Sequence, residues 1–115
     1  MEVKANATAK YIRTSAQKTR LVADEVRGKK VGEALNLLKF SIQKHVARDV
    51  EKVVKSAVAN LVDKNSDLNI DESELVISVI QVDEGPVLKR FIAKSQGRAG
   101  RILKRMCHIS VTVSN

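Results

Sequence analysis

The C-terminal part of the chain, residues 85–115, contains seven Lys or Arg residues and no Asp or Glu. Apart from these cations it reads as a strand, a turn near Ser95-Gln96-Gly97 and a returning strand. Residues 87–106 hold too few apolar side chains to form a core, and an isolated two-stranded ribbon is marginally stable in water. Because so basic a hairpin would repel itself without a surrounding polyanion, nucleic acid is the first partner to consider. The seven cations are Lys89, Arg90, Lys94, Arg98, Arg101, Lys104 and Arg105.

The formal net charge of +8 is sorted into blocks along the chain. Residues 1–55 carry thirteen Lys or Arg against six Asp or Glu, whereas residues 56–84 carry one Lys against seven acids. A protein with one face on a polyanion and another in solvent needs such sorting, and a merely soluble protein does not. Aromatic residues make up only 3% of the chain, which argues against a stacking platform for bases.

The chain of 115 residues is expected to form a single domain, 1–115, with an ordinary apolar content of 43%. Its globular part is predicted over about 1–84 and 106–115, and an extended basic hairpin over about 85–105. The lone Cys107 permits no internal disulfide, which fits a reducing compartment. Charged residues break any early apolar run, and no apolar stretch approaches the ~20 residues that cross a bilayer. We therefore expect a cytoplasmic protein with no membrane partner.

Hydrophobic periodicity predicts the main helix and the strands. Residues 3–12 alternate between apolar and polar, with Tyr11 on the apolar side, and predict a half-buried strand. Residues 75–82 form a nearly continuous apolar run typical of a buried strand, and alternation over 109–113 predicts the final strand. A stripe with helical spacing predicts a long amphipathic helix over about 42–64. This stripe consists of Val46, Val50, Val53, Val54, Ala57, Val58, Leu61 and Val62.

Two shorter helices are predicted between the first strand and the long helix. Thr14 and Gln17 form a plausible capping box for a helix that ends near Arg27, with Ser15 as an alternative cap. Gly28 suits the left-handed position that follows a helix. Three apolar side chains are expected to face inward from this helix: Leu21, Val22 and Val26. The short second helix is marked by Val31, Ala34, Leu35 and Leu38.

The remaining segments connect these elements. Residues 65–74 are polar and acidic and predict a loop. The run Asp83-Glu84-Gly85-Pro86 predicts a bend or bulge, because proline cannot donate to a central ladder. Together the elements predict an α+β fold in which three helices pack on a small antiparallel sheet and a long β-hairpin protrudes.

A second basic group surrounds the first strand and the first helix. Its cations suit phosphate, and its neutral side chains can bond phosphate or 2′-hydroxyl oxygens. The simpler alternative is a solvated helix face whose last cations complement the helix C-terminus. Beside a basic hairpin we favour the binding interpretation. The members of this first-helix cluster are Lys10, Arg13, Ser15, Gln17, Lys18, Arg20, Arg27, Lys29 and Lys30.

No constellation of residues suggests catalysis or a metal site. His45 and His108 are far apart in sequence, and Cys107 and His108 on one strand would face opposite sides and could not chelate together. His108 is either an RNA contact beside the hairpin or a structural histidine. Neighbouring Asp83 and Glu84 are interpreted as turn residues. We therefore expect no enzyme, cofactor, metal or small-molecule substrate.

Two function classes compete with a structural RNA-binding protein. The runner-up is a free-standing basic regulator that binds nucleic acid, and the third class is a small enzyme. A regulator should show symmetry or a helix that reads a groove, but the second helix carries Glu33, Asn36 and Lys39 outward. An enzyme should show a set of cooperating side chains, and none is found.

Two sets of motifs resemble a known family. The first set is Ser15-Ala16-Gln17-Lys18, Arg20-Leu21-Val22-Ala23-Asp24, Arg27-Gly28-Lys29-Lys30-Val31 and Ala34-Leu35. The second and more specific set is Val82-Asp83-Glu84-Gly85-Pro86, Lys89-Arg90, Gly97-Arg98-Ala99, Arg101-Ile102-Leu103-Lys104-Arg105 and His108-Ile109. In order and spacing they resemble the family of bacterial large-subunit ribosomal protein twenty-two of the L series, over about residues 5–113.

This resemblance implies three helices on a three-stranded antiparallel sheet with a long hairpin. It also implies a structural constituent of the large ribosomal subunit that binds rRNA, supports assembly and lines the polypeptide exit tunnel with its hairpin. The implied partners are large-subunit rRNA, neighbouring ribosomal proteins and the nascent polypeptide. By this resemblance the hairpin cations and the first-helix cluster other than Lys10 are expected to be rRNA contacts. Lys10 and His108 remain candidates from their position beside the basic regions.

The tip of the hairpin departs from the family's pattern. Members commonly have Pro-Arg-Ala-Lys before the tip glycine, whereas this chain has Ala93-Lys94-Ser95-Gln96 and so lacks a proline and one cation. Members often carry an acid after Arg98-Ala99, where this chain has Gly100. The expected tunnel-lining residues are Ala93, Lys94, Ser95, Gln96, Gly97 and Arg98.

Overall fold

The computed structural model describes residues 3–65, 74–93, 95–97 and 99–115. Its three helices and its three-stranded antiparallel sheet, in the order β1-β3-β2, confirm the predicted α+β fold. In chain order the elements are β1 (Lys4–Ile12), α1 (Ala16–Val26), α2 (Val31–Lys39), α3 (Lys44–Lys64), β2 (Val76–Ala93), a 3-10 turn η2 (Ser95–Gly97) and β3 (Ala99–Ser114). Within this described part, no helix is both long and apolar enough to span a membrane.

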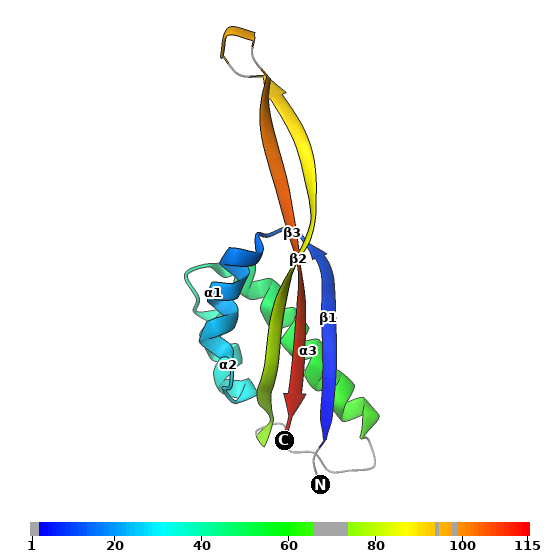
Figure 1. Ribbon diagram of the computed structural model, residues 1–115. Helices are drawn as coiled ribbons and strands as arrows, with labels where there is room; N and C mark the ends of the chain where they lie inside the picture. The colour runs from blue at the N-terminus through cyan, green and yellow to red at the C-terminus, as the bar shows by residue number, and fades with distance from the viewer. Residues whose placement is uncertain (1–2, 66–73, 94, 98) are drawn as a thin grey trace.

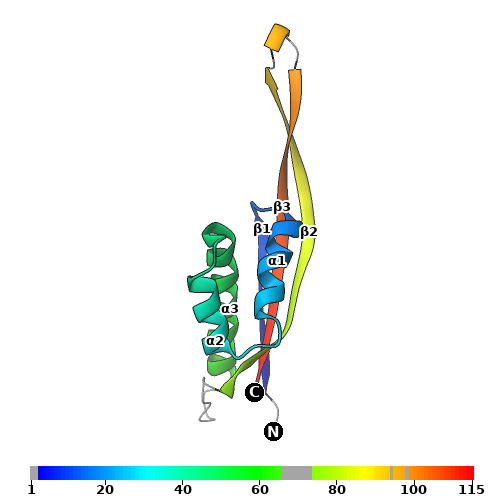
Figure 2. The same ribbon diagram turned by 90° about the vertical axis from the view of Figure 1, so that its left-hand side faces the viewer.

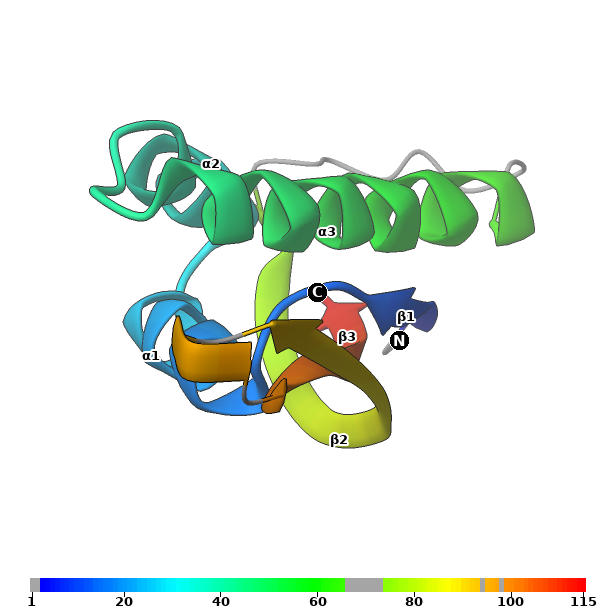
Figure 3. The same cartoon turned by 90° about the horizontal axis from the view of Figure 1, so that it is seen from above.

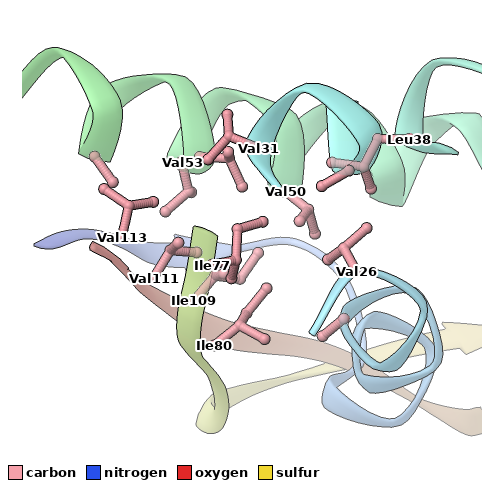
Figure 4. Packing of buried hydrophobic residues seen from close by; sticks show 14 of the residues in the cluster. Val26, Val31, Leu38, Val50, Val53, Ile77, Ile80, Ile109, Val111 and Val113 are labelled. Carbon is pink, nitrogen blue, oxygen red and sulfur yellow. The ribbon is translucent and has the colours of Figure 1, made fainter. Parts of the chain in front are cut away.

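Helices α2 and α3 form a layer over one face of the sheet, where α3 lies across that face and α2 packs against α3 (Figure 1, Figure 3). Helix α1 lies beside the edge strand β2. The predicted stripe of α3 faces the sheet, where Val50 and Val53 lie above Ile77, Ile109 and Val111 (Figure 4). Removal of these aliphatic side chains from water drives the packing. The long helix begins at Lys44, two residues later than predicted.

The start of α1 differs from the predicted capping box. Ser15 is the N-cap, and its Oγ accepts a hydrogen bond from the backbone N–H of Lys18 at 3.4 Å. The alternative cap is therefore confirmed and the box with Thr14 is wrong. The expectation that Leu21 faces inward is also wrong, because its side chain is 57% exposed. The inward position is taken by Thr19, whose hydroxyl donates to the Ser15 carbonyl at 3.0 Å and so tolerates burial.

The alternation of β1 breaks near its end. Ala9 pairs with Ile109 but Ile12 pairs with Cys107, so β1 has one extra residue in a bulge. Tyr11 lies in this bulge with a φ of 59° and is exposed, which contradicts its predicted place on the apolar side. Because of the extra residue, Ile12 instead packs against the core.

A second bulge lies where β2 leaves the globular part. Glu84 pairs with Cys107 and Val87 pairs with Arg105, so the predicted irregularity at Asp83-Glu84-Gly85-Pro86 is confirmed. A proline fits here because an unpaired bulge residue needs no donor. Gly85 suits a close approach of the two strands, since a Cβ at this position would lie 3.3 Å from the backbone of Met106.

Beyond this bulge, β2 and β3 continue as a two-stranded hairpin that projects away from the helices (Figure 1, Figure 2). We call residues 85–105 the arm. Its pairing reaches Ala93 opposite Ala99, and the turn forms at Ser95–Gly97 as predicted. The molecule measures 66 × 25 × 15 Å because of this projection. The predicted loop falls mostly on residues 66–73, which lie outside the described residues.

Two adjacent leucines of α2 test the importance of the core. Leu38 is 2% exposed and Leu37 is 39% exposed. We expect Leu38→Ala to lower the free energy of unfolding by about 2–5 kcal/mol, because it leaves a cavity. Leu37→Ala should cost under about 1 kcal/mol, because its side chain is partly solvated already. Urea titrations of both variants measure the difference, and equal losses would contradict this packing.

Candidate nucleic-acid interface

The arm exposes cations on a framework that buries very little. The described arm cations are all exposed, and none of them pairs with a carboxylate in the described part of the chain. Several apolar side chains are exposed beside them, including Phe91 at 73%. The described arm cations are Lys89, Arg90, Arg101, Lys104 and Arg105. Two predicted contacts and tip residues, Lys94 and Arg98, lie outside the described residues.

The register of the arm keeps its cations from lying directly opposite one another. Each described cation faces an apolar residue across the ladder. Directly opposite side chains project from the same face, so aliphatic stems of Lys and Arg can cover their apolar partners while the charges reach solvent. This arrangement reduces the self-repulsion that the composition alone implies. The five pairs are Val87 with Arg105, Leu88 with Lys104, Lys89 with Leu103, Arg90 with Ile102 and Phe91 with Arg101.

The base of the arm and the start of α1 form one basic site. Arg13, Ser15 and Lys18 lie with Lys104 and Arg105 around a cavity of about 720 Å³, which we call the arm-base cavity. The first-helix cluster and the hairpin, predicted separately, therefore meet in space. A smaller cavity of about 470 Å³ brings Gln17 into the same region, again beside Lys18 and Arg105.

Two helix ends strengthen the positive potential of the arm-base cavity. Helices α1 and α3 both begin at its wall, and neither has an acid in its first turn. Their free N–H groups and helix dipoles favour an anion such as phosphate. Thr14 also borders the cavity, and its buried hydroxyl has no hydrogen-bond partner among the described residues. An oxygen-rich ligand would supply such a partner.

His45 is a residue of this site that the sequence analysis missed. His45 is distant from His108 in sequence, yet it lines the arm-base cavity from the first turn of α3. The signal that could have found it is the pair Lys44-His45 at a helix start without an acid or a side-chain cap. An uncapped, acid-free helix start is suited to an anion from a partner.

Arg20 and Arg27 bind within the protein itself. Arg20 donates from Nε and Nη2 to the Val82 carbonyl at 3.2 and 3.0 Å, and Arg27 Nη2 donates to the Ile80 carbonyl at 3.1 Å. Arg27 also pairs with Asp24. Because β2 is an edge strand, its outer carbonyls need such donors. Both arginines therefore attach α1 to the sheet.

The other members of the first-helix cluster are dispersed. The Lys29 backbone pairs with Ile77 at the start of β2, and Lys30 bridges Val76. These lysines follow α1, whose eleven residues separate them from its start by roughly 16 Å. Lys10 is exposed on β1, beside the bulge.

His108 has a structural contact. Its Nδ1 accepts a hydrogen bond from the Tyr11 backbone N–H at 3.0 Å, and the two rings meet edge to face at 5.0 Å. This contact holds the β1 bulge against β3, so the structural alternative for His108 has direct support. Cys107, its neighbour on β3, is buried on the opposite face as expected.

This small α+β domain joins an exposed basic arm to a basic cavity. These are the features of an RNA-binding protein. The family model described as Ribosomal protein L22p/L17e matches residues 7–114 of the 115, and the chain belongs to this family. It is a structural constituent of the large ribosomal subunit in the cytoplasm, where it binds rRNA and ribosomal neighbours. The family is one of structural proteins rather than enzymes. The resemblance inferred from the motifs is thereby confirmed.

Removal of two cations from the arm-base cavity tests its role. We expect Arg13→Ala combined with Arg105→Ala to weaken binding to large-subunit rRNA and to reduce its dependence on salt. The slope of log K against log salt should fall by roughly 1.5–2 if both side chains contact phosphate. Filter binding at several salt concentrations measures it. The matched control is Arg48→Ala combined with Lys52→Ala on the exposed face of α3, and an equal slope change there would contradict a specific site.

Proposed function

We propose that the arm passes through folded rRNA of the large subunit and that its tip forms part of the wall of the polypeptide exit tunnel. The observation that carries this proposal is the projecting arm itself, which exposes five described cations and has no Asp or Glu within residues 85–105. Phosphate groups would neutralise the exposed cations of this surface, whereas an apolar protein surface would leave them unpaired. The globular part then remains at the periphery of the subunit.

The length of the arm supports a role at a distance from the core. From Val87 to Ala93 the strand alone spans roughly 20–23 Å at the rise of an extended strand, and the turn lies beyond it. The tip is therefore carried well beyond the last helix, as the side view shows (Figure 2). Only the tip would reach a tunnel, while the strands between tip and core contact RNA.

The two basic regions together support a role in assembly. The arm and the arm-base cavity share Lys104 and Arg105. A protein that binds phosphates both along a projecting ribbon and at its base can hold together RNA segments that are distant in sequence. Each phosphate contact releases counterions, so these contacts supply affinity without reading bases.

The tip offers small and neutral groups to a passing chain. Among the described tip residues, Ala93, Gln96 and Gly97 are exposed, and Gln96 and Gly97 adopt left-handed backbone conformations with φ near 62° and 72°. Such a surface presents backbone and amide groups rather than a deep pocket. We propose that it contacts the nascent polypeptide without a strong sequence preference.

Limited proteolysis tests whether RNA holds the arm. In free protein, trypsin should cut after Lys89, Arg90 or Arg101, because the ribbon has no core to protect it. In assembled large subunits the same bonds should resist. Lys52 and Lys55 in α3 provide internal controls that should resist in both states, since this helix packs on the sheet. Full resistance of the arm in free protein would contradict the proposal.

Cross-linking from the tip tests its place in the tunnel. A photoreactive amino acid in place of Gln96 should form adducts with a stalled, labelled nascent chain in intact ribosomes. The same substitution at Gln81, which is exposed on β2 beside the core, should form none. If neither position, or only position 81, reacts with the nascent chain, the arm does not line the tunnel. Binding to rRNA could still hold in that case, because the cavity variants measure it separately.

A further inference from the structure

We propose that a groove between α1 and α2 is a docking site for an apolar segment bearing Lys or Arg, supplied by another protein of the large subunit. This inference goes beyond the tunnel and RNA roles, because the residues that line the groove come from α1, α2 and the segment after α2 and not from the arm. Figure 2 shows that these helices lie below the arm. We call it the apolar groove. Its volume is about 640 Å³, and its walls come from α1, α2 and the connection to α3.

Four large apolar side chains are exposed along the apolar groove. Leu21 of α1 and Leu37 of α2 are 57% and 39% exposed, and Phe40 and Ile42 beyond α2 are 79% and 100% exposed. None of the four serves the core of the described structure, which α1 and α2 complete with other residues. Exposed apolar side chains gathered in this way mark a surface that a partner covers.

The charge of the apolar groove selects the chemistry of that partner. Glu25 and Glu33 line it, and no Lys or Arg does, in a chain that has 21 Lys or Arg and 13 Asp or Glu. Neither carboxylate has an ion pair among the described residues. Helical spacing of four residues places Glu25 beside Leu21 and Glu33 beside Leu37, so each wall carries one acid next to one leucine.

This combination excludes RNA as the occupant and favours a basic peptide. Phosphates would be repelled by the two carboxylates and would leave the leucines uncovered. A segment with apolar residues between Lys or Arg satisfies both features at once, and the neutral amides of Asn36 and Gln43 can bond its backbone. The arm-base cavity has the opposite charge, so the protein separates a surface for RNA from a surface for protein.

The size of the apolar groove explains why the partner is a ribosomal neighbour and not a second copy of this chain. A groove of this volume accommodates a few side chains, whereas a stable free complex buries about 1,600 Å². The contact is therefore weak alone and forms when RNA holds both proteins at high effective concentration. A second copy would also bring the same two carboxylates to the contact.

Cross-linking in assembled large subunits tests this docking site. The probe is p-benzoylphenylalanine in place of Phe40 in the full chain, irradiated within the particle and analysed after RNase treatment. We expect an adduct with a ribosomal protein, through a segment that contains apolar residues and Lys or Arg. The same probe in place of Leu103, in the arm, should react with rRNA and provides the matched control.

Charge reversal then separates docking from mere proximity. Glu25→Lys combined with Glu33→Lys should lower the yield of the protein adduct at least about tenfold, because like charges replace opposite ones. Asp63→Lys, an exposed acid at the far end of α3, should leave the yield unchanged. The proposal is overturned if the probe reacts with rRNA, with a second copy of the chain or with nothing. It is also overturned if the two charge reversals leave the yield of the protein adduct unchanged.

Discussion

One continuous hydrogen-bonded ladder connects the core of the protein to the tip of its arm. Strands β2 and β3 pair from Val76 opposite Ser114 to Ala93 opposite Ala99, interrupted only by bulges. In the globular part, β3 is the central strand and its side chains reach α3. In the arm, the same strands face solvent on both sides. Burial in the globular part therefore fixes the position and direction of a ribbon that could not fold by itself.

This dependence divides the surface of the protein by chemistry. Cations and helix starts gather at the arm and at its base, where we propose that rRNA binds. Acids and exposed leucines gather between α1 and α2, where we propose a protein neighbour. Arg20 and Arg27 belong to neither group, because they donate to the carbonyls of Val82 and Ile80 and attach α1 to the sheet. A cation in a basic sequence is thus not always available to RNA.

The sequence predicted those elements that depend on long, regular burial. The stripe of α3 was correct over most of its length because 3.6-residue periodicity over 21 residues has one structural solution. Two expectations about burial were wrong, at α1 and at the end of β1. The buried face of α1 follows helical spacing through Thr19 and Val22, and Leu21 lies off that face although it is more apolar than Thr19. Thr19 tolerates burial because its hydroxyl has a backbone partner, and Tyr11 is exposed because a bulge reverses the alternation of β1. Composition does not reveal register, so the pairing of each described arm cation with an apolar residue could not be predicted. The sequence could not predict the arm-base cavity, because this cavity forms only where α1, α3 and β3 meet in space.

The bulge between Glu84 and Val87 sets the direction in which the arm leaves the core. Gly85 and Pro86 of β2 stand there opposite Met106 alone, and an extra residue of this kind bends its strand and increases the right-handed twist. Loss of one of the two residues would leave Glu84 opposite Cys107 and Val87 opposite Arg105, so every cross-strand pair of the ribbon would survive. The ribbon would keep its surface but would point elsewhere relative to the helices.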